Sequence, residues 1–461
     1  MQLPYQADQG LPPSQRRMAM LAVLLAVSMA TFDIAIVNTA LPRIAHDLHT
    51  DAATSIWVVS AYQLSLVATL LPFASLGEIV GHRRVYLGGL VVFTSASILC
   101  ALSWTLPILA SARVLQGLGA AAVVSVNLAL VRFIYPPHLL GRGVGMNALF
   151  VGASFTAGPS LASLILSFGP WPYLFFINVP MGVAAMFVGW KYLPNTTRSS
   201  HPFDVVAAVL AGMTFVLIVL GIDSAGHGGG LQEMAAEWLA AVVCLVSLLR
   251  RQSGHPAPML ALDLFRNKVF ALSSLTSICA FATQGLAFVS LPFLFTGSLG
   301  LSQVEAGILL TPWPAIVASL APVSGRMADR YSTGLLGGIG LGTLAVGMLL
   351  LSSLPMHPSY ADIIWRLLLC GGGFGLFQAP NLKALMSAAP PHRSGGASGI
   401  VSISRNMGQA SGAALVAVCF RLVPEHGPRM ALMLGCGFAS CAAIASLLRL
   451  AAKPPARIGA D

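Results

Sequence analysis

A single acidic residue lies inside a long apolar stretch near the start of the chain. Asp33 belongs to the segment "TFDIAIVNTALP" (31–42), and between Met18 and Ala30 only Ser28 is polar. A carboxylate at membrane depth is costly, and such residues commonly belong to proton relays or transport pathways. No histidine falls within an apolar stretch. Asp33 is therefore the candidate proton carrier, with a structural ion pair as the alternative.

Arg113 is the candidate partner of Asp33. Asp33 lies eight residues before Leu41, where its apolar stretch ends, and Arg113 lies seven residues after Leu106, where another begins. At 1.5 Å per residue, these positions are about 12 Å and about 10 Å from the same membrane face. The two side chains can neutralise each other, and a bound proton or a cationic substrate would break the pair. A permanent salt bridge is the alternative.

The composition indicates which elements hold these residues. Of 461 residues, 56% are hydrophobic and 9% charged, whereas soluble proteins carry about 25% charged residues. Apolar runs of about 18 residues or more cross the bilayer as helices. The chain is therefore predicted to be an all-α polytopic membrane protein in a lipid bilayer. About fourteen spans are predicted, near 18–41, 54–76, 84–103, 106–131, 143–167, 173–190, 204–222, 236–249, 269–296, 303–325, 334–353, 362–382, 398–420 and 430–448.

The distribution of basic residues predicts the orientation. With the N-terminal tail assigned to the cytoplasm, nineteen of the 25 Lys and Arg residues fall on the cytoplasmic side, three on the other side and three within spans. This bias follows the positive-inside rule, so the formal charge of +10 needs no nucleic-acid partner. Both termini are expected in the cytoplasm, and the bacterial inner (plasma) membrane is the expected location.

Paired segments indicate two related halves. "LGEIVGHRR" (76–84) and "SGRMADRYSTG" (324–334) are short charged loops with glycine, while "ARVLQGLGAA" (112–121) and "WRLLLCGGGFG" (365–375) each place glycines after an arginine. Repeats of this kind mark transporter halves. The predicted organisation is a cytoplasmic tail (1–17), a six-helix bundle (18–190), a linker with two inserted spans (191–268), a second six-helix bundle (269–448) and a cytoplasmic tail (449–461).

The sequence lacks the motifs of several other functions. No lysine follows a glycine, so the phosphate-binding loop G-x-x-x-x-G-K-[ST] is absent. No nucleotide is therefore expected, and energy must come from an ion gradient or the substrate's own gradient. The seven cysteines form no C-x-x-C pair, and the histidines have no paired metal-ligand spacing. Neither a metal nor a cofactor is expected, and the protein is not expected to be an enzyme.

Further polar, aromatic and helix-distorting residues lie within the spans. Glycines of "QGLGAA" and "GGGFG" allow close helix approach, and "TPWPAI" (311–316) is expected to distort a helix. The alternative is that Gly and Pro are simply common in membrane helices. A mostly apolar substrate cavity with a few polar anchors is predicted, although each residue alone could serve packing. Its candidate lining residues are Asn38, Tyr62, Gln63, Gln116, Gln284, Phe288, Trp313, Phe377, Gln378 and Asn381.

Taken together, these segments resemble the major facilitator superfamily, and within it the fourteen-span drug:proton antiporter branch. The resemblance covers essentially the whole chain. "FDIAIVNTALPRI" looks like the branch's D-x-x-I-V-N-x-A-L-P, and "RVLQGLGAA" looks like R-x-x-Q-G-x-G-A-A. "FTAGPSLAS" is similar to the antiporter element G-P-x-x-G-G, and "WPYLFFINVPMG" to W-R-W-x-F-x-I-N-V-P-x-G. The inserted pair of spans belongs to the same pattern.

The resemblance implies roles for particular residues. Asp33 would couple protons to transport, Arg113 would support proton movement, and Gly152, Gly158 and Pro159 would shape the antiporter helix bend. Conformational switching would involve Glu78, Gly81, Arg83 and Arg84 in the first loop and Gly325, Asp329 and Arg330 in the second. The first loop departs from the family pattern G-x-L-x-D-R-x-G-R-R at Ala74, Glu78 and Ile79.

The function expected from the sequence is secondary active transport by alternating access. The protein would act as a monomer that exports amphipathic organic compounds, with cations as candidates, in exchange for protons. A symporter or facilitator importing a specific metabolite is one alternative. A non-transporting membrane sensor or scaffold is another, which the absence of a soluble domain disfavours.

Overall fold

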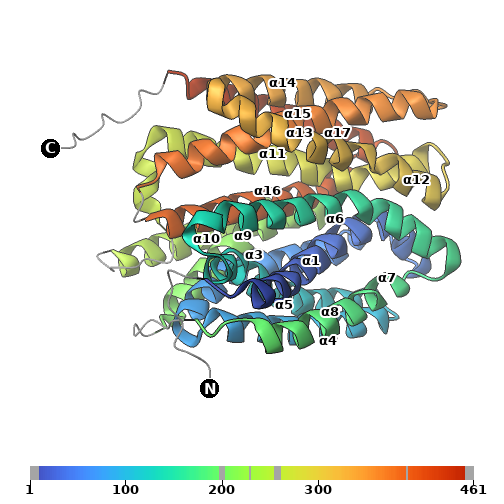
Figure 1. Ribbon diagram of the computed structural model, residues 1–461. Coiled ribbons are helices and arrows are strands. Elements are labelled where there is room, and N and C mark those ends of the chain that lie inside the picture. The colour runs from blue at the N-terminus through green and yellow to red at the C-terminus, as the bar shows by residue number, and fades with distance from the viewer. Residues whose placement is uncertain (1–9, 197–202, 228–229, 254–260, 391–392, 452–461) are drawn as a thin grey trace.

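Long helices make up nearly the whole of the structure (Figure 1). It is a computed structural model that describes residues 10–196, 203–227, 230–253, 261–390 and 393–451, and these ranges contain no strand. Figure 1 shows the N-terminal helices in the lower part of the view and the C-terminal ones in the upper part. The predicted all-helical fold is confirmed.

The first half contains six membrane helices, two of them interrupted near one end. α1 packs against α6 and α8, and α5 packs against α3 and α4. Short α2 and α7 precede α3 and α8 directly, separated from them by Ile56 and Ile177. The bounds are α1 Pro13–Asp47, α2 Ala52–Ser55, α3 Trp57–Val80, α4 His82–Ala101, α5 Leu106–Ile134, η1 Pro137–Leu139, α6 Leu140–Phe168, α7 Tyr173–Phe176 and α8 Asn178–Tyr192.

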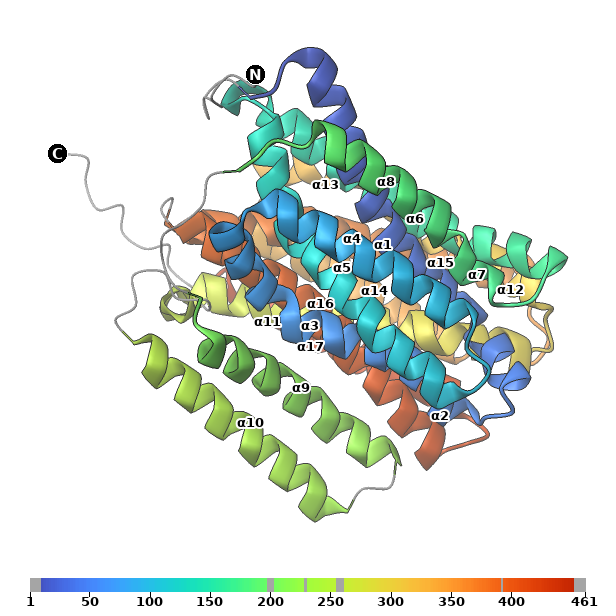
Figure 2. The same ribbon diagram turned by 90° about the horizontal axis from the view of Figure 1, so that it is seen from below.

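The two inserted spans form a hairpin beside the bundle. α9 (Val205–His227) packs against α3 and α16, while α10 (Leu231–Gln252) packs on α9 and lies at the periphery (Figure 2). α10 is longer than the predicted span at 236–249. Arg251 ties its end to the start of α9, because its Nε donates to both carboxylate oxygens of Asp204 at 3.0 and 2.9 Å. This guanidinium holds the pKa of Asp204 below its usual range.

The second half also contains six membrane helices. α14 packs against α15 and α17, and α11 packs against α16 and α17. The predicted distortion at 311–316 is present, because α12 ends at Leu310 and α13 begins at Pro312. The bounds are η2 Leu262–Arg266, α11 Lys268–Phe293, η3 Leu294–Ser298, α12 Gln303–Leu310, α13 Pro312–Arg330, α14 Thr333–Ser352, α15 Tyr360–Ala388, α16 Ser394–Leu422 and α17 Gly427–Leu448.

The described helices fit a membrane setting. Thirteen of the helical segments are long and apolar enough to cross a bilayer. α16 has 29 residues and is more polar, and it packs between α3, α9 and α11. Large apolar side chains such as Phe187 and Trp190 point outward, each 72% exposed, as expected of a lipid-facing surface. These helices agree with the predicted count of about fourteen.

Glycines set the closest approaches between helices. A Cβ on Gly117 of α5 would lie 2.4 Å from the carbonyl oxygen of Tyr62 on α3. A Cβ on Gly373 of α15 would lie 2.5 Å from the carbonyl oxygen of Gly340 on α14. Real Cβ atoms do not come so close, so each position requires glycine. The first contact brings α5, which carries Arg113, against α3.

Candidate functional site

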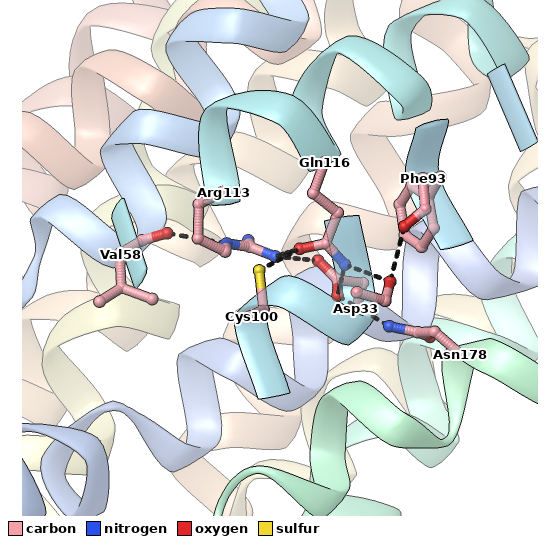
Figure 3. A network of polar contacts seen from close by, with 8 residues as sticks. Asp33, Val58, Phe93, Cys100, Arg113, Gln116 and Asn178 are labelled. Carbon is pink, nitrogen blue, oxygen red and sulfur yellow. Dashed lines mark hydrogen bonds and ion pairs between the residues drawn. The ribbon is translucent and has the colours of Figure 1, made fainter. Parts of the chain in front are cut away.

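Asp33 lies at the centre of a buried polar network (Figure 3). Its side chain and that of Arg113 are each 1% exposed and form an ion pair through Arg113 Nη1 and Asp33 Oδ2. The other carboxylate oxygen, Oδ1, accepts from Gln116 Nε2 at 2.8 Å and from Asn178 Nδ2 at 3.0 Å. Asp33 thus accepts from three donors, two on Oδ1 and one on Oδ2.

The guanidinium of Arg113 is held from several sides. Its Nε donates to the carbonyl oxygen of Val58 at 2.9 Å, and its Nη1 also donates to Gln116 Oε1 at 2.6 Å. The ring of Tyr62 faces it at 4.2 Å, a cation–π distance. The pair predicted from residue spacing is therefore present, and it joins α1 to α5.

Asn178 is a member of this network that was not among the predicted site residues. It is fully buried and opens α8, directly after the break at Ile177. The sequence does point to Asn178, because this residue belongs to the family-like segment "WPYLFFINVPMG" (171–182). Close packing brings α8 into place: a Cβ on Gly182 would lie 2.1 Å from Thr94 Oγ1 of α4.

Four of the predicted cavity residues carry buried polar atoms that have no hydrogen-bond partner among the described residues. These atoms are Asn38 Oδ1, Tyr62 OH, Gln63 Oε1 and Trp313 Nε1. A buried polar atom without a partner is costly in a folded protein. Each of these atoms is thus free to bond water or a ligand.

Aromatic rings gather around Trp313 in the second half. Phe288 packs edge-on against Trp313, with ring centroids 5.3 Å apart, and against Phe155 of α6 at 5.1 Å. Phe377 continues the apolar surface through Phe374 at 5.6 Å. We call Phe155, Phe281, Phe288, Trp313, Phe374 and Phe377 the aromatic cluster. Five of these rings belong to one buried apolar core of the second half, and Phe155 packs against it.

The remaining predicted cavity residues lie in different settings. Gln284 is buried, and its Oε1 accepts from Gln409 Nε2 of α16 at 3.0 Å. Asn381 belongs to a separate polar network, in which its Oδ1 accepts from Arg449 Nη1 at 2.8 Å. Gln378 is exposed. Gln116 is part of the Asp33 network.

The predicted switch residues lie at the helix ends of the two loops. In the first loop, Glu78 is near the end of α3, and Gly81 separates α3 from α4 with a φ of +107° that favours glycine. Arg83 and Arg84 open α4, and Arg83 Nη1 donates to Asn195 Oδ1 at 3.0 Å.

In the second loop, Gly325, Asp329 and Arg330 end α13. Asp329 pairs with Lys383 of α15 at 2.6 Å.

The residues predicted to shape the antiporter bend lie in α6. Pro159 is inside this helix, which runs from Leu140 to Phe168. A Cβ on Gly158 would lie 2.4 Å from Ala35 Cβ, so Gly158 allows α6 to approach α1 two residues from Asp33. Gly152, six residues earlier, faces Ala318 of α13 in the other half.

The comparisons with known proteins agree with this architecture. The sequence model of the Major Facilitator Superfamily matches residues 23–413. The uncharacterized transporter YebQ of Escherichia coli is 47% identical over 96% of this chain and 98% of its own. The riboflavin transporter RibZ of Clostridioides difficile is 30% identical over 88% of each chain. The tetracenomycin C resistance and export protein of Streptomyces glaucescens is 31% identical over 95% of this chain and 82% of its own.

The family match and these relatives each extend over most of the chain. The polar network and the aromatic cluster therefore lie in a carrier, and the protein is not an enzyme. The chain belongs to the Major Facilitator Superfamily of membrane transporters.

Proposed function

We propose that this transporter exports amphipathic organic compounds in exchange for protons, with Asp33 as the proton site. The observation that carries the proposal is the burial of the Asp33–Arg113 pair, at 1% exposure on each side, within membrane helices. A buried ion pair contributes little to stability, because desolvation offsets the attraction. A role in proton coupling accounts for a charged pair at this depth in the membrane.

The proposed proton step acts on the contacts of Asp33. A proton on the carboxyl group removes the charge that balances Arg113 and turns one acceptor oxygen into a donor. The bonds from Gln116 and Asn178 then weaken, since both rely on the negative carboxylate. These bonds connect α1 to α5 and α8, so protonation shifts the balance between two helix arrangements.

Contacts between the halves support an alternating-access cycle. Ser160 Oγ lies 2.7 Å from Thr311 Oγ1, and Gln303 Nε2 donates to the carbonyl oxygen of Thr39 at 2.5 Å. These residues lie toward the end of the bundle that is external if the N-terminal tail is cytoplasmic. We propose that this end is closed here and that rocking of the halves, with the two loops as switches, opens it.

The proposed setting is a bacterial inner membrane with both termini in the cytoplasm and the protein as a monomer. The nineteen cytoplasmic Lys and Arg residues support this orientation. One proton entering down 100 mV supplies about 2.3 kcal/mol. A tenfold substrate gradient takes about 1.4 kcal/mol, so one proton per cycle is sufficient.

The proposed direction of transport is supported by the aromatic cluster and by the name of one relative. The relative from Streptomyces glaucescens is an export protein for tetracenomycin C, and the aromatic cluster suits a large apolar molecule. The second candidate is transport of a specific metabolite, which is favoured by similarity to a riboflavin transporter.

Everted membrane vesicles distinguish these candidates. An imposed pH gradient should drive accumulation of an exported dye such as ethidium, and a protonophore should abolish it. A metabolite importer would leave the dye unmoved and would move its own substrate in the opposite direction. A protein that moves neither dyes nor metabolites under either gradient would contradict the proposal.

A further inference from the structure

Arg405, in the middle of α16, is a cation without a partner among the residues that the structure describes. Its side chain is half-buried, and it forms no hydrogen bond or ion pair within the described chain. It lies eleven residues after Ser394 and seventeen before Leu422. At 1.5 Å per residue, these ends are about 16 Å and about 25 Å away. Arg405 therefore lies within the part of α16 that crosses the hydrocarbon core.

Three other buried or half-buried arginines have acceptors. Arg113 pairs with Asp33. Arg366 pairs with Asp362 at 3.0 Å. Arg449 donates to Asn381 Oδ1 at 2.8 Å and to Ser273 Oγ at 2.9 Å. An arginine at membrane depth is expensive without such partners, and marks a substrate or ion pathway.

The packing of α16 places Arg405 at the junction of the halves. On one face, Ile403 and Met407 belong to an apolar core shared with α3 of the first half. On another, Gly408 lies against α11 of the second half, where a Cβ would be 2.4 Å from the carbonyl oxygen of Ile278. Figure 1 shows α16 running through the centre of the molecule. This junction is where transporters of this architecture bind their cargo.

The residue one turn from Arg405 connects it to the aromatic cluster. Gln409 shares its helix face, because residues i and i+4 are neighbours, and donates to Gln284 of α11 at 3.0 Å. Gln284 lies between Phe281 and Phe288 on α11, and both rings belong to the cluster through Phe374 and Trp313. A guanidinium, an amide pair and aromatic rings thus follow one another along α16 and α11.

We propose that Arg405, with Gln409 beside it, is the anion-binding subsite of the transport path. The planar fork of a guanidinium matches a carboxylate or a sulfonate, which it binds through two parallel hydrogen bonds. The aromatic cluster takes the apolar body of the same molecule. This subsite adds amphipathic organic anions to the compounds that the carrier accepts. Asp33 lies in a separate network, with three donors on its two carboxylate oxygens.

This inference rests on the proposed transport function, and equilibrium binding tests it independently of protons. The purified full-length chain is placed in nanodiscs of phosphatidylcholine, which excludes anionic lipids. The probes are 2-naphthoate and 2-naphthylmethylamine, which share one ring system and differ in charge. The variants are Arg405→Gln and Arg405→Lys, with Arg421→Gln as the control, because Arg421 is exposed in the last turn of the same helix.

Wild type and Arg421→Gln should bind the naphthoate more tightly than the amine. Arg405→Gln should lose about tenfold or more of the naphthoate affinity, since a hydrogen-bonded charge is removed. Arg405→Lys should retain part of it, and amine binding should not fall. Equal affinity of wild type for the two probes, or wild-type naphthoate binding by a folded Arg405→Gln, would overturn the assignment.

Asp33→Asn separates the two proposals. This variant should bind naphthoate like wild type while it loses proton-driven transport. If proton-driven transport survives in Asp33→Asn, the proton mechanism fails and the anion site stands. If naphthoate binding is absent from wild type while proton-driven dye transport is present, the anion site fails and the proton mechanism stands.

Discussion

At the scale of single residues, the central feature is a buried carboxylate with a hydrogen-bond donor on each of its oxygens. Asp33 accepts from Arg113, Gln116 and Asn178, which belong to two other helices. In a low-dielectric interior such bonds are strong, and losing one is costly. A proton is small enough to enter this network without displacing side chains. A substrate cation could reach Asp33, which is 1% exposed, only if the surrounding helices moved apart, and this supports the proposal that its ligand is a proton.

Removal of the Arg113 guanidinium should uncouple substrate transport from the proton gradient. Arg113→Ala deletes the counter-charge of Asp33 and leaves a buried acidic group without its partner, so proton-driven efflux should fall by about tenfold or more. Arg113→Lys should retain part of the activity, because a point charge replaces the guanidinium fork. The measurement is ethidium accumulation in everted vesicles under a pH gradient.

Arg43→Ala is the matched control for this prediction. Arg43 also pairs with an aspartate, Asp47, but its side chain is 54% exposed. Exposed pairs contribute little, so transport should be unchanged. Wild-type efflux by Arg113→Ala at equal expression would reduce Arg113 to a packing role.

At the scale of elements, the sequence predicts the positions of the helices well but predicts poorly which helices pack against each other. Apolar runs locate the spans, because each segment that crosses a bilayer must be apolar along its own sequence. α10 extends beyond its predicted limits, since Glu233 and Glu237 near its start interrupt the apolar pattern. The Asp33–Arg113 pair follows from matched depth alone. Asn178 could not be placed from depth, because its contact depends on how α8 packs against α1 and α4.

The packing of α6 on α1 should depend on Gly158. Gly158→Ala places a Cβ 2.4 Å from Ala35 Cβ, and overpacking of this kind costs about 1–3 kcal/mol. The melting temperature, followed by fluorescence-detected size exclusion, should drop by several degrees. Gly145→Ala on the same helix meets no atom within 4 Å and should be neutral. Equal melting temperatures of the two variants would mean that α6 does not approach α1 at this position.

At the scale of the whole molecule, two halves meet around α16 and around the contacts of Gln303 and Ser160. Arg405 lies at the first of these junctions, and Asp33 lies on the helix that Gln303 contacts. Proton site and proposed cargo site are thus on different halves. Coupling between them requires a change in how the halves sit together, as alternating access provides.

The orientation can be tested with reporters at two points of the chain. A reporter fused to the C-terminus should be cytoplasmic, and one inserted after Gly230, between α9 and α10, should be external, because of the bias of basic residues. Alkaline phosphatase and green fluorescent protein fusions give opposite readouts for the two sides. If both reporters lie on the same side of the membrane, the predicted number of spans between the two positions is wrong.

The most direct test of the central claim is proton-driven efflux by Asp33→Asn. Asparagine keeps the shape and polarity of the side chain but cannot take up or release a proton. The measurement is ethidium accumulation in everted vesicles across a series of pH gradients, with Asp47→Asn as the control, because Asp47 belongs to the exposed pair. Asp33→Asn should insert normally and lose pH-driven efflux, Asp33→Glu should keep part of it with a shifted pH profile, and the control should match wild type. Efflux by Asp33→Asn at the wild-type rate, with the same pH dependence, would contradict the account.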